Sequence, residues 1–88
     1  MTYRVEYLAS VVRDDLPRVA QPIRKRIREA IERKLMIDPL SFGRPLRYSL
    51  KGARRMRVGD CRVIFTIEEH TRTVLIVKIG HRREVFEG

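Results

Sequence analysis

The chain has 88 residues, and 20 Lys and Arg against 11 Asp and Glu give it a formal charge of +9. This length predicts a single domain over residues 1–88 with a small core, and a hydrophobic content of 43% argues against disorder. The single cysteine, Cys61, excludes an internal disulfide and a four-cysteine zinc site, and we expect neither a metal nor a cofactor. Because no apolar run approaches the length of a membrane span, we expect a cytoplasmic protein without a membrane partner.

The N-terminal part of the chain predicts a strand followed by a short helix. Side chains of residues 3–7 alternate between apolar and polar, which is the pattern of a half-buried strand. Ser10 is placed to cap a helix that runs to about Leu16. Asp14 and Asp15 are expected on the outer side of this helix.

A second helix is predicted from about Pro22, which suits a first helical turn, to Leu35. From Ile23 onward apolar side chains recur every third or fourth residue, and charged residues occupy the opposite face. Asp38-Pro39 ends this helix. Because the link between the two helices is short, we expect them to pack as an antiparallel hairpin.

Three strands are predicted in the C-terminal half, after a connecting loop over residues 40–52. They lie at Arg54–Val58, Cys61–Glu68 and Thr73–Ile79. Gly59-Asp60 suits a two-residue hairpin turn, and residues 69–72 form the next turn. The order β-α-α-β-β-β predicts an α+β domain in which the helical hairpin packs on a small, mostly antiparallel sheet.

Positive charge is concentrated between residues 44 and 62, where seven cations accompany one acid, Asp60. If Gly59-Asp60 is the turn, Arg57 lies opposite Arg62 and shares a face with it and with Arg55. The apolar side chains that then face the core are Met56, Val58, Cys61, Val63, Phe65 and Ile67. Because like charges opposed across strands destabilise a sheet, we interpret the arginine face as an anion-binding site rather than a merely solvated surface.

The last strand extends this face if the turn before it has three or five residues. The side chains facing the core are then Leu75, Val77 and Ile79. Lys78 lies beside Arg62, and Gly80 and Arg82 continue along the same face. A turn of four residues would invert the pattern and bury Lys78, which is costly, so we favour the first register.

Converging arginines suit a phosphate polymer, and RNA carries its own nucleophile, the 2′-hydroxyl. Cleavage by that group needs no metal, in agreement with the lack of a carboxylate cluster near the arginines. His81 either acts as an acid or base, a role that suits a histidine side chain at physiological pH, or packs at an edge, because strand alternation points it away from Arg82. Phe86 either stacks on a base or covers the core.

The stretch over residues 50–65, together with residues 38–46 and 79–86, resembles the RelE branch of the RelE/ParE toxin superfamily. The core of the resemblance is the motif Arg-x-Arg-Val-Gly-Asp-x-Arg-Val at residues 55–63. The resemblance spans nearly the whole chain and implies a RelE-like fold.

The resemblance implies a toxin of a type II toxin–antitoxin system, a ribosome-dependent mRNA interferase. Such an endoribonuclease cuts mRNA in the A site and leaves a 2′,3′-cyclic phosphate. The residues that match the basic catalytic positions of the family are Arg55, Arg57, Arg62 and Arg82. The residues expected to bind substrate around them are Lys51, Lys78, His81 and Phe86. The implied partners are a cognate antitoxin with an acidic segment, the ribosome and mRNA, with no small-molecule ligand.

Two departures from the family pattern leave alternatives open. Phe86 stands where many relatives have a tyrosine that stacks on substrate and moves protons, so the sequence does not identify the general base. Cys61 stands where an aromatic residue is common. The alternatives are a ParE-like toxin that inhibits DNA gyrase without nuclease chemistry, and a catalytically weakened RNA- or ribosome-binding relative.

Overall fold

The structure, a computed structural model, describes residues 2–47, 52–83 and 85. Its five strands form one sheet in the order β1-β5-β4-β3-β2. The strands are β1 (Arg4–Tyr7), β2 (Arg44–Pro45), β3 (Arg54–Val58), β4 (Cys61–Glu68) and β5 (Thr73–His81). The helical segments are η1 (Val11–Asp15), η2 (Leu16–Arg18), α1 (Gln21–Ala30), η3 (Ile31–Leu35) and α2 (Pro39–Phe42).

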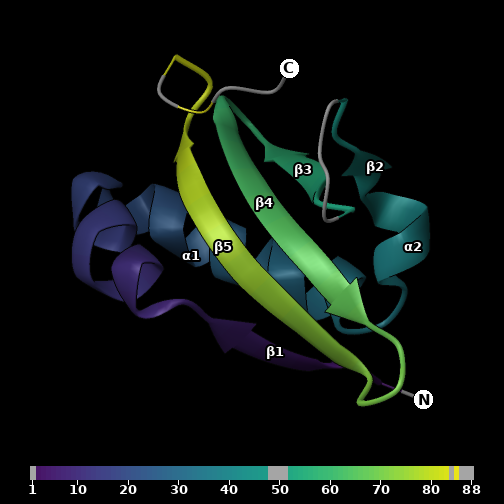
Figure 1. Cartoon of the computed structure of the whole chain (residues 1–88). Coiled ribbons are helices and arrows are strands. Elements are labelled where there is room, and N and C mark those ends of the chain that lie inside the picture. The colour runs from purple at the N-terminus through teal and green to yellow at the C-terminus, as the bar shows by residue number, and fades with distance from the viewer. Residues whose placement is uncertain (1, 48–51, 84, 86–88) are drawn as a thin grey trace.

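Helices cover one face of the sheet, which confirms the predicted α+β class. Figure 1 shows α1 crossing behind β4 and β5 and leaving their other face turned toward the viewer. β1 runs parallel to β5, and the other neighbouring strands are antiparallel. The apolar stripe predicted for the second helix packs on this sheet. The largest fully buried side chains of the core include Ile27, Ile31, Leu35, Phe65, Ile76 and Ile79.

The first helix differs from its prediction in two ways. Ser10 is itself in a helical conformation and makes no capping hydrogen bond, because the helix already begins at the carbonyl of Leu8, which accepts from the Val11 N–H at 3.0 Å. Asp15 is buried, whereas the sequence predicted it on the outer side with Asp14. Adjacent residues on a helix point about 100° apart, so the turn that buries Val11 also turns one of the two acids inward.

The segment predicted as a loop contains a helical turn, α2, and a two-residue edge strand, β2. Pro39 fits the first turn of α2, where its missing N–H costs no helical hydrogen bond. The guanidinium of Arg54 donates from Nη2 to the carbonyl oxygens of Leu40 at 3.1 Å and Gly43 at 2.7 Å. These long-range bonds hold α2 against the sheet, and sequence periodicity carries no signal for them.

Gly43 is required by packing rather than by its backbone conformation. A Cβ at this position would overlap the ring of Phe65, coming within 2.9 Å of Cε1. Phe65 is fully buried, so its ring has no room to move away. We expect Gly43→Ala to lower the free energy of unfolding by about 1–3 kcal/mol, the usual range for overpacking a core. Urea unfolding measures this, and Ser41→Ala at an exposed position of the preceding helix α2 should leave the midpoint unchanged.

The β3–β4 hairpin has the predicted register throughout. Arg57 pairs with Arg62, Met56 with Val63 and Val58 with Cys61. Gly59 has a φ of +60°, the left-handed conformation that a two-residue turn requires and glycine adopts readily. The prediction that the apolar side chains of these strands face the core is also confirmed, since Met56 and Val63 are buried.

The β4–β5 hairpin combines both of the registers considered. The turn has four residues, so Val74 and Ile76 face the core near it, and the prediction that Leu75 and Val77 do so is wrong. A register shift at Ile64/Phe65 then inserts one extra residue, Val77, into β5. Beyond this bulge the strand follows the favoured register. Ile79 faces the core, and Lys78 and Gly80 lie opposite Ile64 and Arg62 on the other face.

Candidate functional site

Three adjacent strands bring arginines together on the sheet face that the helices do not cover. Arg44 pairs with Arg55, and Arg57 pairs with Arg62, so all four side chains lie on one side of the sheet. We call these four residues the cationic face. The predicted grouping of Arg55, Arg57 and Arg62 is confirmed, and Arg44 joins them because β2 extends the sheet at its edge.

Arg62 differs from its neighbours in being buried, with 6% of its surface exposed. Its Nη1 donates to the carbonyl oxygen of Cys61 at 3.2 Å and lies 3.5 Å from that of Gly59. These contacts hold the guanidinium beside the β3–β4 turn. Arg57, directly across the strand pair, is exposed. The face therefore pairs one fixed cation with one that reaches freely into solvent.

Arg82 follows β5 and is carried to the same end of the sheet. Its backbone N–H donates to the carbonyl oxygen of Asp60 at 2.8 Å, which ties it to the β3–β4 turn. Its side chain is exposed. The turn that pairs Arg57 with Arg62 thus also anchors Arg82, and the four predicted catalytic arginines come from β3, β4 and the segment after β5.

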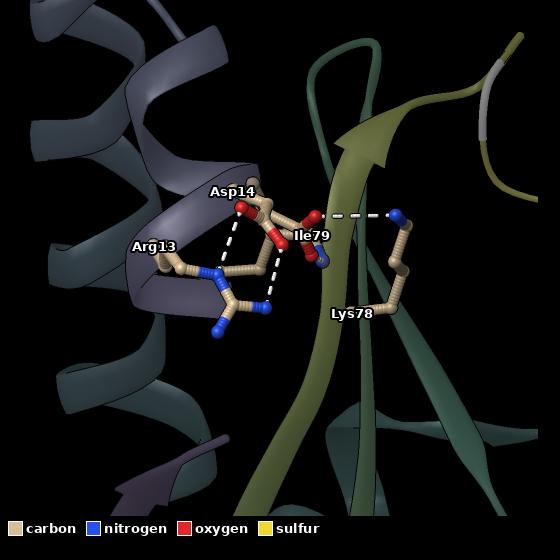
Figure 2. A network of polar contacts seen from close by, with 5 residues as sticks. Arg13, Asp14, Lys78 and Ile79 are labelled. Carbon is tan, nitrogen blue, oxygen red and sulfur yellow. Dashed lines mark hydrogen bonds and ion pairs between the residues drawn. The ribbon is translucent and has the colours of Figure 1, made fainter. Parts of the chain in front are cut away.

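Lys78 forms an ion pair with Asp15, which was predicted to lie on the outer side of the first helix. Its Nζ lies 3.1 Å from Oδ1 of Asp15, whose side chain is only 6% exposed, and Figure 2 shows this contact between η1 and β5. The Ile79 N–H donates to Oδ2 of Asp15 at 2.9 Å. β1 pairs with β5 only as far as Ile76, and beyond that point Asp15 supplies an acceptor on the same edge of β5. Much of the charge of Lys78 is therefore balanced locally.

Asp14, next to Asp15, has a different environment. It accepts hydrogen bonds from Arg13 at 3.0 and 3.1 Å, and both residues are exposed (Figure 2). These hydrogen bonds to the Arg13 guanidinium hold the pKa of the Asp14 carboxyl below its usual value. Both side chains are exposed on η1 and bond to each other, so the pair serves as a natural control for the buried Asp15.

His81 lies on the other side of the sheet from the cationic face. It pairs with Cys61, and with Asp15 and Arg18 these residues line a cavity of about 190 Å³. Its Nδ1 accepts from the Arg83 N–H at 3.1 Å, which places the proton of a neutral imidazole on Nε2. Cys61 is buried, as predicted. The structure therefore separates His81 from the arginines with which it was predicted to bind substrate.

Lys51 and Phe86, the other two residues predicted to bind substrate, lie outside the described residues. Their roles stay predictions. Among the residues that the structure describes, no group of three or more His, Cys, Asp or Glu side chains is arranged to hold a metal ion. Within the same ranges, no helix is both long and apolar enough to cross a membrane.

Phe42 is a candidate site residue that the sequence interpretation missed, because it lies in the segment over residues 40–52 that was predicted only as a connecting loop. Its side chain lies at the end of α2, and 47% of its surface is exposed. A cavity of about 240 Å³ is lined by Phe42, Arg44, Arg55, Met56 and Arg57. An aromatic side chain in a basic stretch is the signal that could have found it.

Comparisons with known proteins show that the chain is similar to toxins of toxin–antitoxin systems. The family model described as the ParE toxin of the type II toxin–antitoxin system parDE matches residues 5–86. The chain is 30% identical over 86 residues to the toxin RelG of Mycobacterium tuberculosis, covering 98% of either chain. Among solved structures it resembles the toxin–antitoxin complex RelBE2 from Mycobacterium tuberculosis, with a TM-score of 0.84 and 30% identity over 93% of this chain and 100% of that one. The archaeal RelE–RelB complex from Pyrococcus horikoshii gives a TM-score of 0.75 with 27% identity, over 97% and 100% of the two chains.

Proposed function

Because the chain belongs to the RelE family of toxins of type II toxin–antitoxin systems, we propose that it is an endoribonuclease that cuts mRNA in the ribosomal A site. The observation that supports this proposal is the cationic face. Arg55, Arg57 and Arg62 share one side of the sheet, and Arg82 is tied to the turn between their strands. The placement suits a phosphate group with charge developing on it.

The proposed reaction is an attack of the RNA 2′-hydroxyl on the adjacent phosphorus. A new P–O2′ bond forms, the P–O5′ bond breaks, and the products are a 2′,3′-cyclic phosphate and a 5′-hydroxyl end. The 2′-hydroxyl loses a proton and the leaving 5′-oxygen gains one. The pentacoordinate phosphate carries more negative charge than the ground state, so cations already in position lower the barrier.

The roles proposed for the arginines differ with the burial of their side chains. Arg62 is held by backbone carbonyls and contributes a charge whose position is set before substrate arrives. Arg57 and Arg82 are exposed and can close on the phosphate once the RNA is bound. Arginine suits these positions because its planar guanidinium matches two phosphate oxygens at once. Phe86 brings a ring without a hydroxyl, so proton transfer falls to another group.

We further propose that the toxin is neutralised by a cognate antitoxin. The solved relatives from Mycobacterium tuberculosis and Pyrococcus horikoshii are toxin–antitoxin and RelE–RelB complexes. A net charge of +9 favours a partner that brings an acidic segment, since opposite charges speed association and oppose wrong partners.

A second candidate function is inhibition of DNA gyrase by binding, without nuclease chemistry. It is favoured by the matching family model, which is that of ParE toxins, and by the absence of a hydroxyl on Phe86. The two functions share a scaffold, so the fold does not separate them. They predict different lesions in the cell: mRNA cut within codons in one case, and DNA breaks with intact mRNA in the other.

The proposal is tested by adding purified, antitoxin-free protein to ribosomes stalled with a defined codon in the A site. Primer extension should map a cut inside that codon, and the same mRNA without ribosomes should stay intact. Adding back the antitoxin should abolish the cut. Uncut mRNA in the ribosome-bound sample, together with DNA breaks when gyrase is supplied, would replace the nuclease with the gyrase inhibitor.

A further inference from the structure

The exposed ring of Phe42 stands in the middle of a positively charged surface. It contributes to the wall of the cavity of about 240 Å³ whose other lining residues are Arg44, Arg55, Met56 and Arg57. Arg44 and Arg57 are exposed and Arg55 is half-buried. The ring is not part of the buried core cluster, so the hydrophobic core does not account for an aromatic side chain at this position.

The position of Phe42 is set by contacts on both sides of it in the chain. The carbonyl oxygens of Leu40 and Gly43 both accept from Arg54 Nη2. Gly43 lies directly against the buried ring of Phe65. Lys34 places its Nζ 5.6 Å from the centroid of the Phe42 ring, and this cation–π contact favours one orientation of the ring. An exposed aromatic side chain held in this way loses little entropy when a planar ligand stacks on it.

The three arginines that line the cavity with Phe42 favour binding of an anion. Arg44 pairs directly with Arg55 across β2 and β3, and like charges opposed in this way destabilise the sheet. A phosphate held by Arg44 and Arg57 would bring negative charge next to this pair. The cavity is smaller than the roughly 300–1,000 Å³ typical of sites for drug-sized ligands, so it suits one small planar group rather than a large cofactor.

We propose that this cavity is a nucleotide subsite in which Phe42 stacks on one RNA base while Arg44 and Arg57 hold the phosphate attached to it. The inference rests on the proposed function in taking RNA as the ligand, and it adds a base-binding position to a face otherwise assigned to phosphate. Aromatic stacking on every base is sequence-tolerant, whereas cations alone bind the backbone without touching a base. Phe42 therefore supplies a contact that the arginines cannot.

The test measures binding to a short single-stranded RNA that carries 2-aminopurine, without ribosomes. Stacking on the Phe42 ring should change the 2-aminopurine fluorescence in the wild-type complex. Phe42→Leu should abolish that change and weaken binding roughly 5- to 150-fold, the range expected for one stacked base. Phe42→Trp should keep both. Leu40→Ala is the matched control, because Leu40 is 53% exposed on the same helix and does not line the cavity.

Salt dependence separates the ring from the arginines. Phe42→Leu should leave the slope of log K against log[salt] unchanged, whereas Arg57→Ala should reduce its magnitude by about 0.7, the value for one phosphate contact on a single strand. An RNA with an abasic site at the position occupied by 2-aminopurine should bind the wild type and Phe42→Leu equally well. If Phe42→Leu weakens binding of the abasic RNA as much as binding of the intact RNA, the ring does not contact a base and the proposal fails.

Two further outcomes keep this inference distinct from the nuclease. If fluorescence depends on Phe42 but ribosome-bound mRNA is never cut, the base subsite stands and the nuclease proposal falls. If mRNA is cut but Phe42→Leu changes neither fluorescence nor affinity, the nuclease stands and the subsite is wrong. If Phe42→Leu weakens binding of an acidic antitoxin peptide but leaves RNA binding unchanged, the subsite is also wrong and the cavity is assigned to the protein partner.

Discussion

Arg82→Ala is expected to slow mRNA cleavage on the ribosome by about 10²–10³-fold, the usual loss when one preorganised group that stabilises developing charge is removed. The side chain is exposed, and the contact that anchors this segment is made by the backbone N–H of Arg82 to Asp60, which alanine retains. The substitution should therefore leave the thermal unfolding midpoint close to that of the wild type. Single-turnover cleavage of mRNA with saturating toxin measures the rate of the chemical step.

Arg83→Ala is the matched control for Arg82→Ala. Arg83 is the next residue and is also exposed, so its substitution by alanine removes the same charge from the same end of the sheet. We expect it to weaken ribosome binding slightly at low salt and to leave the single-turnover rate unchanged. Equal losses of rate in the two variants would mean that net charge, rather than a cation at residue 82, accounts for the effect, and would remove Arg82 from the proposed catalytic set.

Asp15→Ala is expected to destabilise the protein strongly. It leaves the buried N–H of Ile79 without its carboxylate acceptor and Lys78 without its ion-pair partner. Hydrogen bonds to charged groups are worth about 1.5–3 kcal/mol, so we expect a loss of about 2–3 kcal/mol. For a domain of this size that corresponds to a fall in Tm of roughly 10–20 °C. Calorimetry or thermal circular dichroism measures it.

Two variants divide this effect between the contacts of Asp15. Asp15→Asn keeps an oxygen that can accept from the Ile79 N–H but lacks the charge that pairs with Lys78, so its Tm should lie between those of Asp15→Ala and the wild type. Asp14→Ala removes the neighbouring acid from its exposed pair with Arg13 and should change Tm little, because exposed ion pairs contribute little. A fall of similar size in Asp14→Ala and Asp15→Ala would show that burial is not the cause.

The fold could be predicted from the sequence wherever the controlling interactions are local. Gly59-Asp60 fixes the β3–β4 turn, and strand alternation then determines that Arg55, Arg57 and Arg62 share a face. The four-residue turn before β5 was considered but not favoured, because the sequence gives no sign of the bulge at Val77 that accommodates it. A single uninterrupted register cannot place Val74 and Ile76 in the core near the turn and also keep Lys78 outside it. The bulge allows both.

The details of the site that the sequence did not predict depend on contacts between distant residues. The burial of Asp15 follows from the uncovered edge of β5, more than sixty residues later in the chain. The exposed position of Phe42 follows from the bonds that Arg54 makes to α2. Periodicity assigns side chains to faces, but it does not describe how one element covers another.

The parallel pairing of β1 with β5 has a consequence for how the protein folds during synthesis. Arg4 pairs with Thr73, so the first strand finds its neighbour only after 69 more residues have been made. Until β5 emerges, the apolar stripe of α1 and η3 lacks the part of its core that Val74, Ile76 and Ile79 supply. Contacts between distant segments slow folding, because the intervening chain must be ordered first. Arg82, which follows β5, therefore joins the arginines of β3 and β4 only after β5 has been made. A chain that ends before β5 lacks this cation.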